Sequence, residues 1–234
     1  MKTVILCGGL GTRLSEETKK IPKPLVKIGN IPILIHIMNI YFKHGYNEFI
    51  LALGYRSRDI ELYFKKKKFK NWKITLVNTG KNTLTGTRIQ KLKKYLINDE
   101  DFFLTYGDGV SNINLKKLLN FHKKKRKVAT LTAVRPPARF GELQIMKSSV
   151  KEFKEKNQVN AGWINGGFFV FNKKIFNFIP SKKNCMLERE PMNNLVKKKE
   201  LLAFKHYDFW QCMDTMRDKD LLNNYLKKGK AKWI

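Results

Sequence analysis

The sequence predicts an α/β fold, in which a mostly parallel sheet carries helices on both faces. In the first 80 residues, short apolar runs alternate with segments of helical periodicity in the order β-α-β-α-β. No repeat or linker interrupts this order, and from Gly141 the pattern shifts to shorter strands of antiparallel character. We therefore expect a single domain over residues 1–234, with a first portion at 1–135 and a smaller, mixed portion at 136–234 that ends in a helix.

The individual elements follow from local patterns. Residues 4–6 are an apolar run typical of a buried strand. Residues 32–44 place apolar side chains at helical spacing, and Gly45 can end that helix. Further strands are expected at 48–53, 72–77, 102–106, 128–134, 143–146, 150–154 and 168–171. Further helices are expected at 57–65, 89–96, 114–126, 188–199 and 221–228.

The charge balance is strongly basic. Lysine and arginine number 48 against 19 acidic residues, for a net charge of +29, which raises nucleic-acid binding as an alternative function. The basic residues, however, lie in short separate runs at 65–68, 123–127 and 197–199. Such runs are typical of solvated helix ends and loops, so we do not expect nucleic acid to be a partner.

No apolar run approaches the length that spans a membrane, and the N-terminus leads directly into a strand without a signal pattern. Cys7, Cys185 and Cys212 are widely spaced, which argues against a disulfide framework or a zinc site. We expect a cytoplasmic protein without a membrane partner.

A glycine-rich turn follows the first strand. It runs from Cys7 to Arg13, and Lys23 follows between two prolines. Glycines let backbone N–H groups approach a phosphate chain, while Arg13 and Lys23 add positive charge. The spacing fits neither the P-loop nor the dinucleotide fingerprint, in which a third glycine would replace Leu14. A polyphosphate site is therefore predicted, with a turn that binds nothing as the alternative.

Two motifs in this region resemble a known family. Gly8-Gly9-Leu10-Gly11-Thr12-Arg13-Leu14 and Pro22-Lys23-Pro24 are similar to the signature of the sugar-1-phosphate nucleotidylyltransferases. Ser15-Glu16-Glu17-Thr18 resembles the cytidylyltransferase members. The resemblance implies a Rossmann-like, nucleotide-diphospho-sugar transferase fold, with Arg13 and Lys23 in catalysis. It also implies nucleotide contacts by Leu6, Cys7, Gly8, Gly9, Leu10, Gly11, Thr12 and Arg13.

A second polar turn resembles a nucleotide-binding motif of the cytidylyltransferases. Leu84-Thr85-Gly86-Thr87-Arg88 differs from that motif by threonine in place of one glycine. The resemblance adds Thr83, Thr85, Gly86 and Arg88 to the nucleotide site. The alternative is a capped helix start with Arg88 in solvent.

Two aspartates are the candidate metal ligands. Asp108 follows an apolar strand and lies between Gly107 and Gly109, at the sheet edge where open α/β folds bind ligands. A carboxylate there suits Mg²⁺, which prefers a few protein oxygens together with phosphate oxygens and water. The segment 209–215 resembles a family motif with Cys212 in place of proline, and the resemblance makes its Asp214 the second ligand. We expect Asp108 in catalysis and Gly107 at the nucleotide.

The second half contains the residues that the resemblance assigns to the sugar phosphate. Glu155-Lys156 keeps the carboxylate and the cation of a family motif but lacks its proline, and Asn165-Gly166-Gly167 matches another closely. The resemblance implies that Glu155 and Asn165, with Gly166, meet the sugar hydroxyls. Lys156 and Lys23 would hold the sugar phosphate.

The expected reaction joins CTP and a sugar 1-phosphate, glucose 1-phosphate first, to give a CDP-sugar and pyrophosphate. The same chemistry with another nucleotide or acceptor is the alternative, favoured by Thr87 and by a segment at 65–71 that is shorter than in the cytidylyltransferases. Family members build their oligomer through that segment, so a homo-oligomer and the choice of base stay open. A basic nucleic-acid-binding protein on a degenerate transferase fold is the second alternative.

Overall fold

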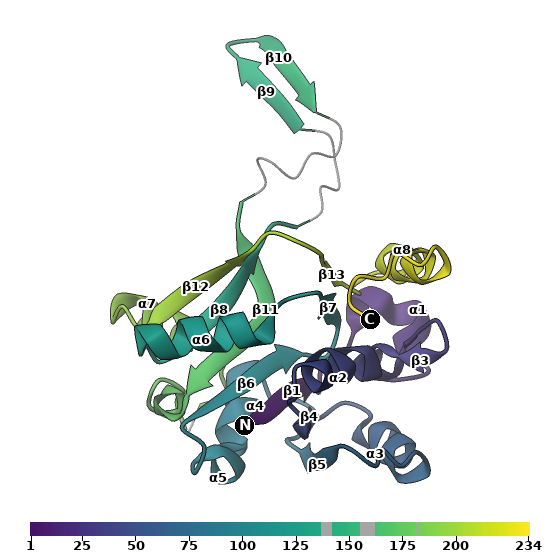
Figure 1. Cartoon of the computed structure of the whole chain (residues 1–234), viewed down its shortest axis with the longest axis vertical. Helices are drawn as coiled ribbons and strands as arrows, with labels where there is room; N and C mark the ends of the chain where they lie inside the picture. Colours follow the sequence, from purple (N-terminus) through teal and green to yellow (C-terminus); the bar gives the residue numbers. More distant parts are fainter. Residues whose placement is uncertain (137–141, 155–161, 182) are drawn as a thin grey trace.

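The centre of the computed structural model, which describes residues 1–136, 142–154, 162–181 and 183–234, is one seven-stranded sheet (Figure 1). Its strand order is β12-β8-β11-β6-β1-β4-β5. Only β11 runs antiparallel to its neighbours in this sheet of the described chain, so the mostly parallel sheet is confirmed. Its strands are β1 (Lys2–Cys7), β4 (Glu48–Leu53), β5 (Lys73–Asn78), β6 (Asp101–Tyr106), β8 (Ala129–Val134), β11 (Ile164–Asn172) and β12 (Leu201–His206).

Each face of the sheet has its own hydrophobic core, because side chains alternate along every strand. In β1, Ile5 belongs to one core, and Val4 and Leu6 belong to the other. The first core includes side chains of α2 (Ile33–Lys43), α3 (Ser57–Lys66), α6 (Leu115–Lys125) and α8 (Met216–Lys227). The second includes side chains of α4 (Thr85–Lys91), α5 (Lys93–Leu96) and α7 (Glu190–Lys197). The prediction of helices on both faces is confirmed.

The expected elements are present, and their ends differ by a few residues. The largest difference is the last helix, which was expected at 221–228 and begins at Met216. Thr215 and Asp218 form a capping box that starts it, with each side chain bonded to the backbone N–H of the other. The helix expected at 89–96 is divided at Leu92 into α4 and α5.

Several short or half-polar elements were not predicted. The strand β12 pairs in parallel with β8 at the edge of the sheet. Two small antiparallel pairs join β2 (Lys27–Ile28) to β3 (Ile31–Pro32), and β7 (Gly109–Ser111) to β13 (Trp210–Cys212). Short helical turns are α1 (Ser15–Thr18), η1 (Thr12–Leu14), η2 (Lys23–Leu25) and η3 (Lys173–Asn177).

The second portion of the chain contributes both to the central sheet and to a separate hairpin. Its strands β11 and β12 lie in the sheet, whereas β9 (Glu142–Met146) and β10 (Ser149–Lys154) form the antiparallel hairpin at the top of Figure 1. None of the described helices is both long and apolar enough to cross a membrane.

The reversed direction of β11 has a consequence for the site. Phe168 of β11 pairs with Thr105 of β6, which ends at Tyr106, so the residues before Gly167 lie beyond the carboxyl end of β6. The pairing with β8 shifts between Asn165 and Phe169, where Gly167 adopts a φ of 78°. This bulge brings Asn165 to the edge at which β1 and β6 end.

Candidate active site

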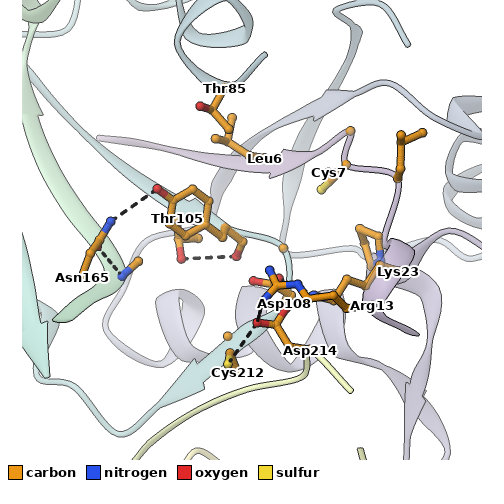
Figure 2. Close-up of a pocket in the computed structure, with 18 of the residues that line it drawn as sticks. Leu6, Cys7, Arg13, Lys23, Thr85, Thr105, Asp108, Asn165, Cys212 and Asp214 are labelled. Atoms are coloured by element: carbon orange, nitrogen blue, oxygen red, sulfur yellow. Dashed lines mark hydrogen bonds and ion pairs between the residues drawn. The ribbon is translucent and has the colours of Figure 1, made fainter. Parts of the chain in front are cut away.

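A cavity of about 1130 Å³ lies at this edge of the sheet (Figure 2). The loop after β1, the residues before and within α4, the end of β6, the start of β11 and the region of β13 and α8 all contribute to its wall. The predicted site residues that line it are Leu6, Cys7, Gly8, Gly9, Leu10, Arg13, Lys23, Thr83, Thr85, Arg88, Gly107, Asp108, Asn165, Gly166 and Asp214.

The remaining predicted site residues have other places. Thr12 and Gly11 do not line the cavity, and Gly11 forms the turn with a φ of 68° that begins η1. Gly86 packs against Cys185, where an added Cβ would come within 2.9 Å of the sulfur. Glu155 and Lys156 lie outside the described residues.

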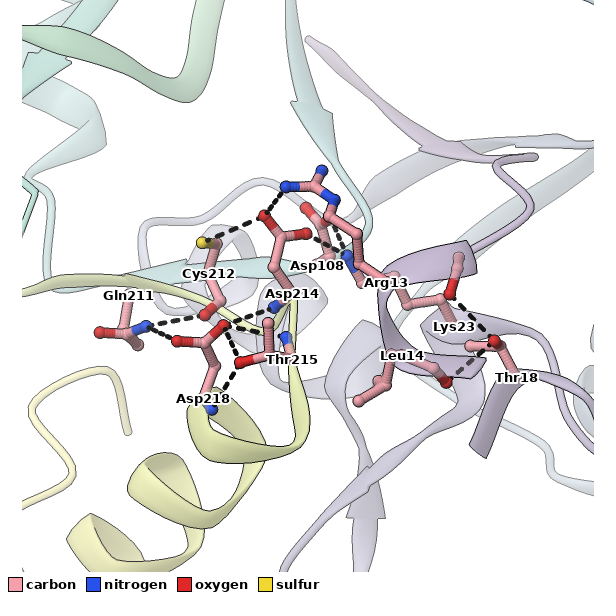
Figure 3. Close-up of polar contacts among 11 residues, drawn as sticks. Arg13, Leu14, Thr18, Lys23, Asp108, Gln211, Cys212, Asp214, Thr215 and Asp218 are labelled. Carbon is pink, nitrogen blue, oxygen red and sulfur yellow. Dashed lines mark hydrogen bonds and ion pairs between the residues drawn. The ribbon is translucent and has the colours of Figure 1, made fainter. Parts of the chain in front are cut away.

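At the centre of the cavity wall, Lys23 joins the two predicted metal ligands. Its Nζ lies 2.7 Å from Asp108 Oδ2 and 2.6 Å from Asp214 Oδ1, and Arg13 Nη1 lies 2.7 Å from Asp214 Oδ2 (Figure 3). The pairing of β13 with β7 brings Asp214 to Asp108, and Met213 N donates to Asp108 O at 2.8 Å. Sequence patterns alone could not pair two aspartates so far apart in the chain.

Burial and charge oppose each other in this cluster. Burial lowers the pKa of Lys23, but the carboxylates of Asp108 and Asp214 outweigh it and hold that pKa above its ordinary value. Burial also raises the pKa of Asp214, but the hydrogen bond and charge of Lys23, with Arg13, outweigh it and lower the pKa. Lys23 is therefore a cation and Asp214 an anion at neutral pH.

The donor set suits a magnesium ion that is shared with phosphates. No group of three or more His, Cys, Asp or Glu side chains in the described chain could hold a metal alone. However, one oxygen each of Asp108 and Asp214 already converges on a single cation, the Lys23 ammonium. Two carboxylates completed by phosphate oxygens and water are the coordination that Mg²⁺ prefers.

The buried side chain of Arg88 connects the glycine-rich loop to neighbouring segments by hydrogen bonds. Its guanidinium donates to the carbonyl oxygens of Gly8 at 2.9 Å, Leu53 at 2.9 Å and Gly80 at 2.9 Å, and to Thr79 Oγ1 at 2.6 Å. The residue is only 4% exposed, so the alternative of Arg88 in solvent is wrong. Arg88 holds the loop in place, while Gly9 and Leu10 are exposed residues whose backbone amides have no partner within the described residues.

Both cysteines of the cavity are protonated thiols. Burial raises the pKa of Cys7, and burial together with Asp214 raises the pKa of Cys212 to about 12. A thiol in this state is a poor nucleophile, so the cavity is not equipped for covalent catalysis by cysteine.

Other residues of the cavity wall were not predicted from the sequence, among them Lys81, Tyr106, Trp210 and Arg217. Tyr106 lies next to Gly107 and Asp108, and Trp210 lies within the motif at 209–215. Arg217 follows Asp214 by three residues, in the first turn of α8. Their closeness in sequence to the motifs is the signal that could have identified them. Trp210 Nε1 donates to Gly166 O at 2.7 Å and so fixes the start of β11.

The comparison with known proteins gives the family. The model of the nucleotidyl transferase family matches residues 2–224. The chain belongs to the nucleotidyl transferase family. This nucleotidyl transferase is similar to the glucose-1-phosphate cytidylyltransferase of Salmonella typhi, with 44% identity in an alignment of 254 positions that covers 100% of this chain and 98% of the relative.

Two further proteins extend the comparison of this nucleotidyl transferase. The probable glucose-1-phosphate cytidylyltransferase of Bacillus subtilis is also 44% identical, and the match covers 100% of this chain and 99% of the relative. The crystal structure of HddC from Yersinia pseudotuberculosis, complexed with GMP-PN, is 25% identical with a TM-score of 0.74. That match covers 96% of this chain and 99% of HddC.

Proposed function

We propose that this nucleotidyl transferase transfers the cytidylyl group of CTP to glucose 1-phosphate, which gives CDP-glucose and pyrophosphate. The observation that carries the proposal is the convergence of Lys23, Asp108 and Asp214 beside the glycine-rich loop. The substrates follow from the two cytidylyltransferases that match over the whole chain.

In the proposed reaction, an oxygen of the sugar phosphate attacks the α-phosphorus of the nucleotide in line. The new P–O bond forms as the bond to the β-phosphate breaks, and pyrophosphate leaves with the bonding electron pair. The reaction needs alignment and neutralisation of charge rather than an enzyme nucleophile. Arg13, whose side chain is largely exposed to the cavity, and the loop amides would stabilise the departing pyrophosphate.

Lys23 would reduce the repulsion between the attacking phosphate and the nucleotide, since its ammonium faces the same cavity as the loop. Asp108 and Asp214 would hold Mg²⁺, which when bound supplies Lewis-acid activation of the phosphates. Asn165 and Gly166 would meet the sugar. Glu155 and Lys156 stay predictions for the sugar and its phosphate.

The two features that favoured another nucleotide do not contribute to the wall of the cavity. Thr87 does not line the cavity, and its hydroxyl donates to Lys183 O and accepts from Cys185 N. The residues from 65 to 71 do not line it either. The described structure thus gives no contact through which these positions would exclude cytosine.

The test is pyrophosphate release with Mg²⁺ and glucose 1-phosphate, using CTP, UTP, dTTP, GTP and ATP in parallel. We expect release with CTP at least about tenfold faster than with any other nucleotide, which corresponds to roughly 1.4 kcal/mol of discrimination. Release with a different nucleotide would keep the reaction and overturn the base. Absence of release with all five would overturn the proposed reaction for this acceptor.

A further inference from the structure

A segment just before α7, residues 183–188, forms hydrogen bonds to the polar turn at residues 82–88. This turn, which is predicted to contact the nucleotide, is called the nucleotide loop below. Asn184 Oδ1 accepts from Leu84 N at 2.9 Å, and its Nδ2 donates to Asn82 O at 3.0 Å. Gly86 N donates to Cys185 O at 3.0 Å. Leu187 N donates to Thr85 Oγ1 at 2.9 Å. The conformation of the nucleotide loop therefore depends on a segment about a hundred residues further along the chain.

Glu188, the last residue of this segment, bonds to both sides of the cavity. Its Oε2 accepts from Thr85 Oγ1 at 2.6 Å, and its Oε1 accepts from the hydroxyl of Tyr106. Thr85 begins α4, whereas Tyr106 ends β6 directly before Gly107 and Asp108. Thr85 and Tyr106 both line the cavity, and an ionised carboxylate can only accept hydrogen bonds from their hydroxyls.

Tyr106 connects Glu188 by hydrogen bonds to Asn165, on the predicted sugar side of the cavity. Because its O–H donates to Glu188, its oxygen is the acceptor for Asn165 Nδ2, at 3.4 Å. Gly167 N donates to Asn165 Oδ1 at 2.8 Å, which fixes the orientation of the amide. The bond from Gly167 uses one of the two acceptor positions of the Asn165 carbonyl oxygen, and the second Nδ2–H of the amide is left for the cavity that the residue lines.

We propose that Glu188 is a positioning residue. It determines which groups donate and which accept hydrogen bonds on the nucleotide side and on the sugar side of the cavity. Through Thr85 it orders the nucleotide loop. Through Tyr106 it makes Asn165 a donor toward an oxygen of the sugar. This inference rests on the function proposed above, and it adds a residue that none of the recognised motifs contains.

The experiment compares Glu188→Gln, Tyr106→Phe and the double variant by steady-state kinetics and by calorimetric titration with CDP-glucose. A glutamine accepts through one atom only, so one hydroxyl must reverse its bond. Both single variants should raise KM for glucose 1-phosphate about tenfold, while kcat changes less than about threefold. The double variant should be no worse than the poorer single one, since the two residues act in one chain of bonds.

KM for CTP distinguishes the contact of Glu188 with Thr85 from its contact with Tyr106. KM for CTP should rise in Glu188→Gln, which disturbs Thr85, and stay near the parent value in Tyr106→Phe. Glu190→Gln is the matched control, because Glu190 lies two residues away, is exposed and pairs with Lys183 at 3.5 Å. It should keep all parent parameters, and thermal melting should show all variants folded.

The possible failures are distinct. An active parent whose Glu188→Gln and Tyr106→Phe variants keep KM and CDP-glucose affinity within about twofold would overturn this inference alone. Additive losses in the double variant would overturn the shared chain of bonds. A parent that neither releases pyrophosphate nor binds CDP-glucose would overturn the proposed function and this inference with it.

Discussion

Lys23 has two electrostatic roles, one toward the two aspartates and one toward the cavity. It neutralises Asp108 and Asp214 at 2.7 and 2.6 Å, and it presents positive charge to the cavity. Lys23→Ala should lower kcat by at least about 10²-fold, because a positioned charge at a phosphoryl-transfer site contributes several kcal/mol. Kinetics of pyrophosphate release measure this. Lys20→Ala, an exposed lysine nearby, is the control, and near-normal turnover in Lys23→Ala would remove Lys23 from the mechanism.

Asp214 should govern the dependence on magnesium. Its carboxylate is ionised through Lys23 and Arg13, and its place is fixed because its backbone N–H donates to Asp218 Oδ2 at 3.1 Å. Asp214→Asn should shift the Mg²⁺ concentration at half-maximal rate upward by about tenfold or more, since one charged ligand is lost. Asp220→Asn, on the exposed side of α8, serves as the control. Coincident magnesium titrations of Asp214→Asn and the parent would contradict the assignment.

At the scale of an element, the glycine-rich loop offers a matched pair of glycines. An added Cβ at Gly8 would come within 2.2 Å of the Arg88 guanidinium carbon, whereas a Cβ at Gly9 meets nothing within 4 Å. Gly8→Ala must displace a buried cation with several hydrogen bonds and should lower the free energy of unfolding by about 2 kcal/mol or more. Gly9→Ala should lie within about 0.5 kcal/mol of the parent. Chemical denaturation measures both, and equal losses would contradict the role of Arg88.

The C-terminal segment is attached to α2 through a histidine that must stay neutral. His36 Nε2 faces Ile28 O at 3.0 Å, and Trp233 Nε1 donates to His36 Nδ1 at 3.2 Å. Burial lowers the pKa of His36, and the hydrogen bond to Ile28 offsets only part of this. Because the folded-state pKa lies below the unfolded one, this stability is complete above the unfolded pKa of about 6.5 and is lost as the pH falls through the folded pKa.

The melting temperature should therefore fall more between pH 7.5 and pH 5.5 in the parent than in His36→Gln, which has no group to protonate at this position. His44→Gln controls for a histidine at the C-terminal cap of the same helix that is only partly buried. Equal pH slopes in the parent and His36→Gln would show that the contact with Trp233 does not depend on the neutral form.

At the scale of the whole molecule, most elements could be predicted because their signals are local. Short apolar runs and helical spacing identified most of the strands and helices that form the two cores. The strand β12 was missed although its first four residues, Leu201 to Phe204, are apolar, because so short an apolar run does not by itself distinguish a strand from part of a helix. Asp108 was predicted from its place after a strand, but only the resemblance paired it with Asp214.

The contacts of Glu188 and Arg88 could not be predicted, because they depend on how distant segments pack. Glu188 meets Thr85 and Tyr106 across 103 and 82 residues. The alternative of Arg88 in solvent is wrong because the residue is buried and donates to Gly8 O, whereas its contact with the nucleotide stays a prediction. Sequence periodicity reports which face of an element is buried, but not which polar groups meet there.

The net charge of +29 on 234 residues is the last property that belongs to the whole chain. Like charges repel more in the compact state than in the expanded one, and salt screens them within about 10 Å at 0.1 M. Raising NaCl from about 10 mM to about 300 mM should therefore raise the melting temperature by several degrees. The double variant Lys68→Glu/Lys70→Glu, at exposed positions between α3 and β5, reduces the repulsion and should show a smaller salt dependence. If melting temperature falls with salt, the ion pairs outweigh the repulsion, and the excess charge would not limit stability.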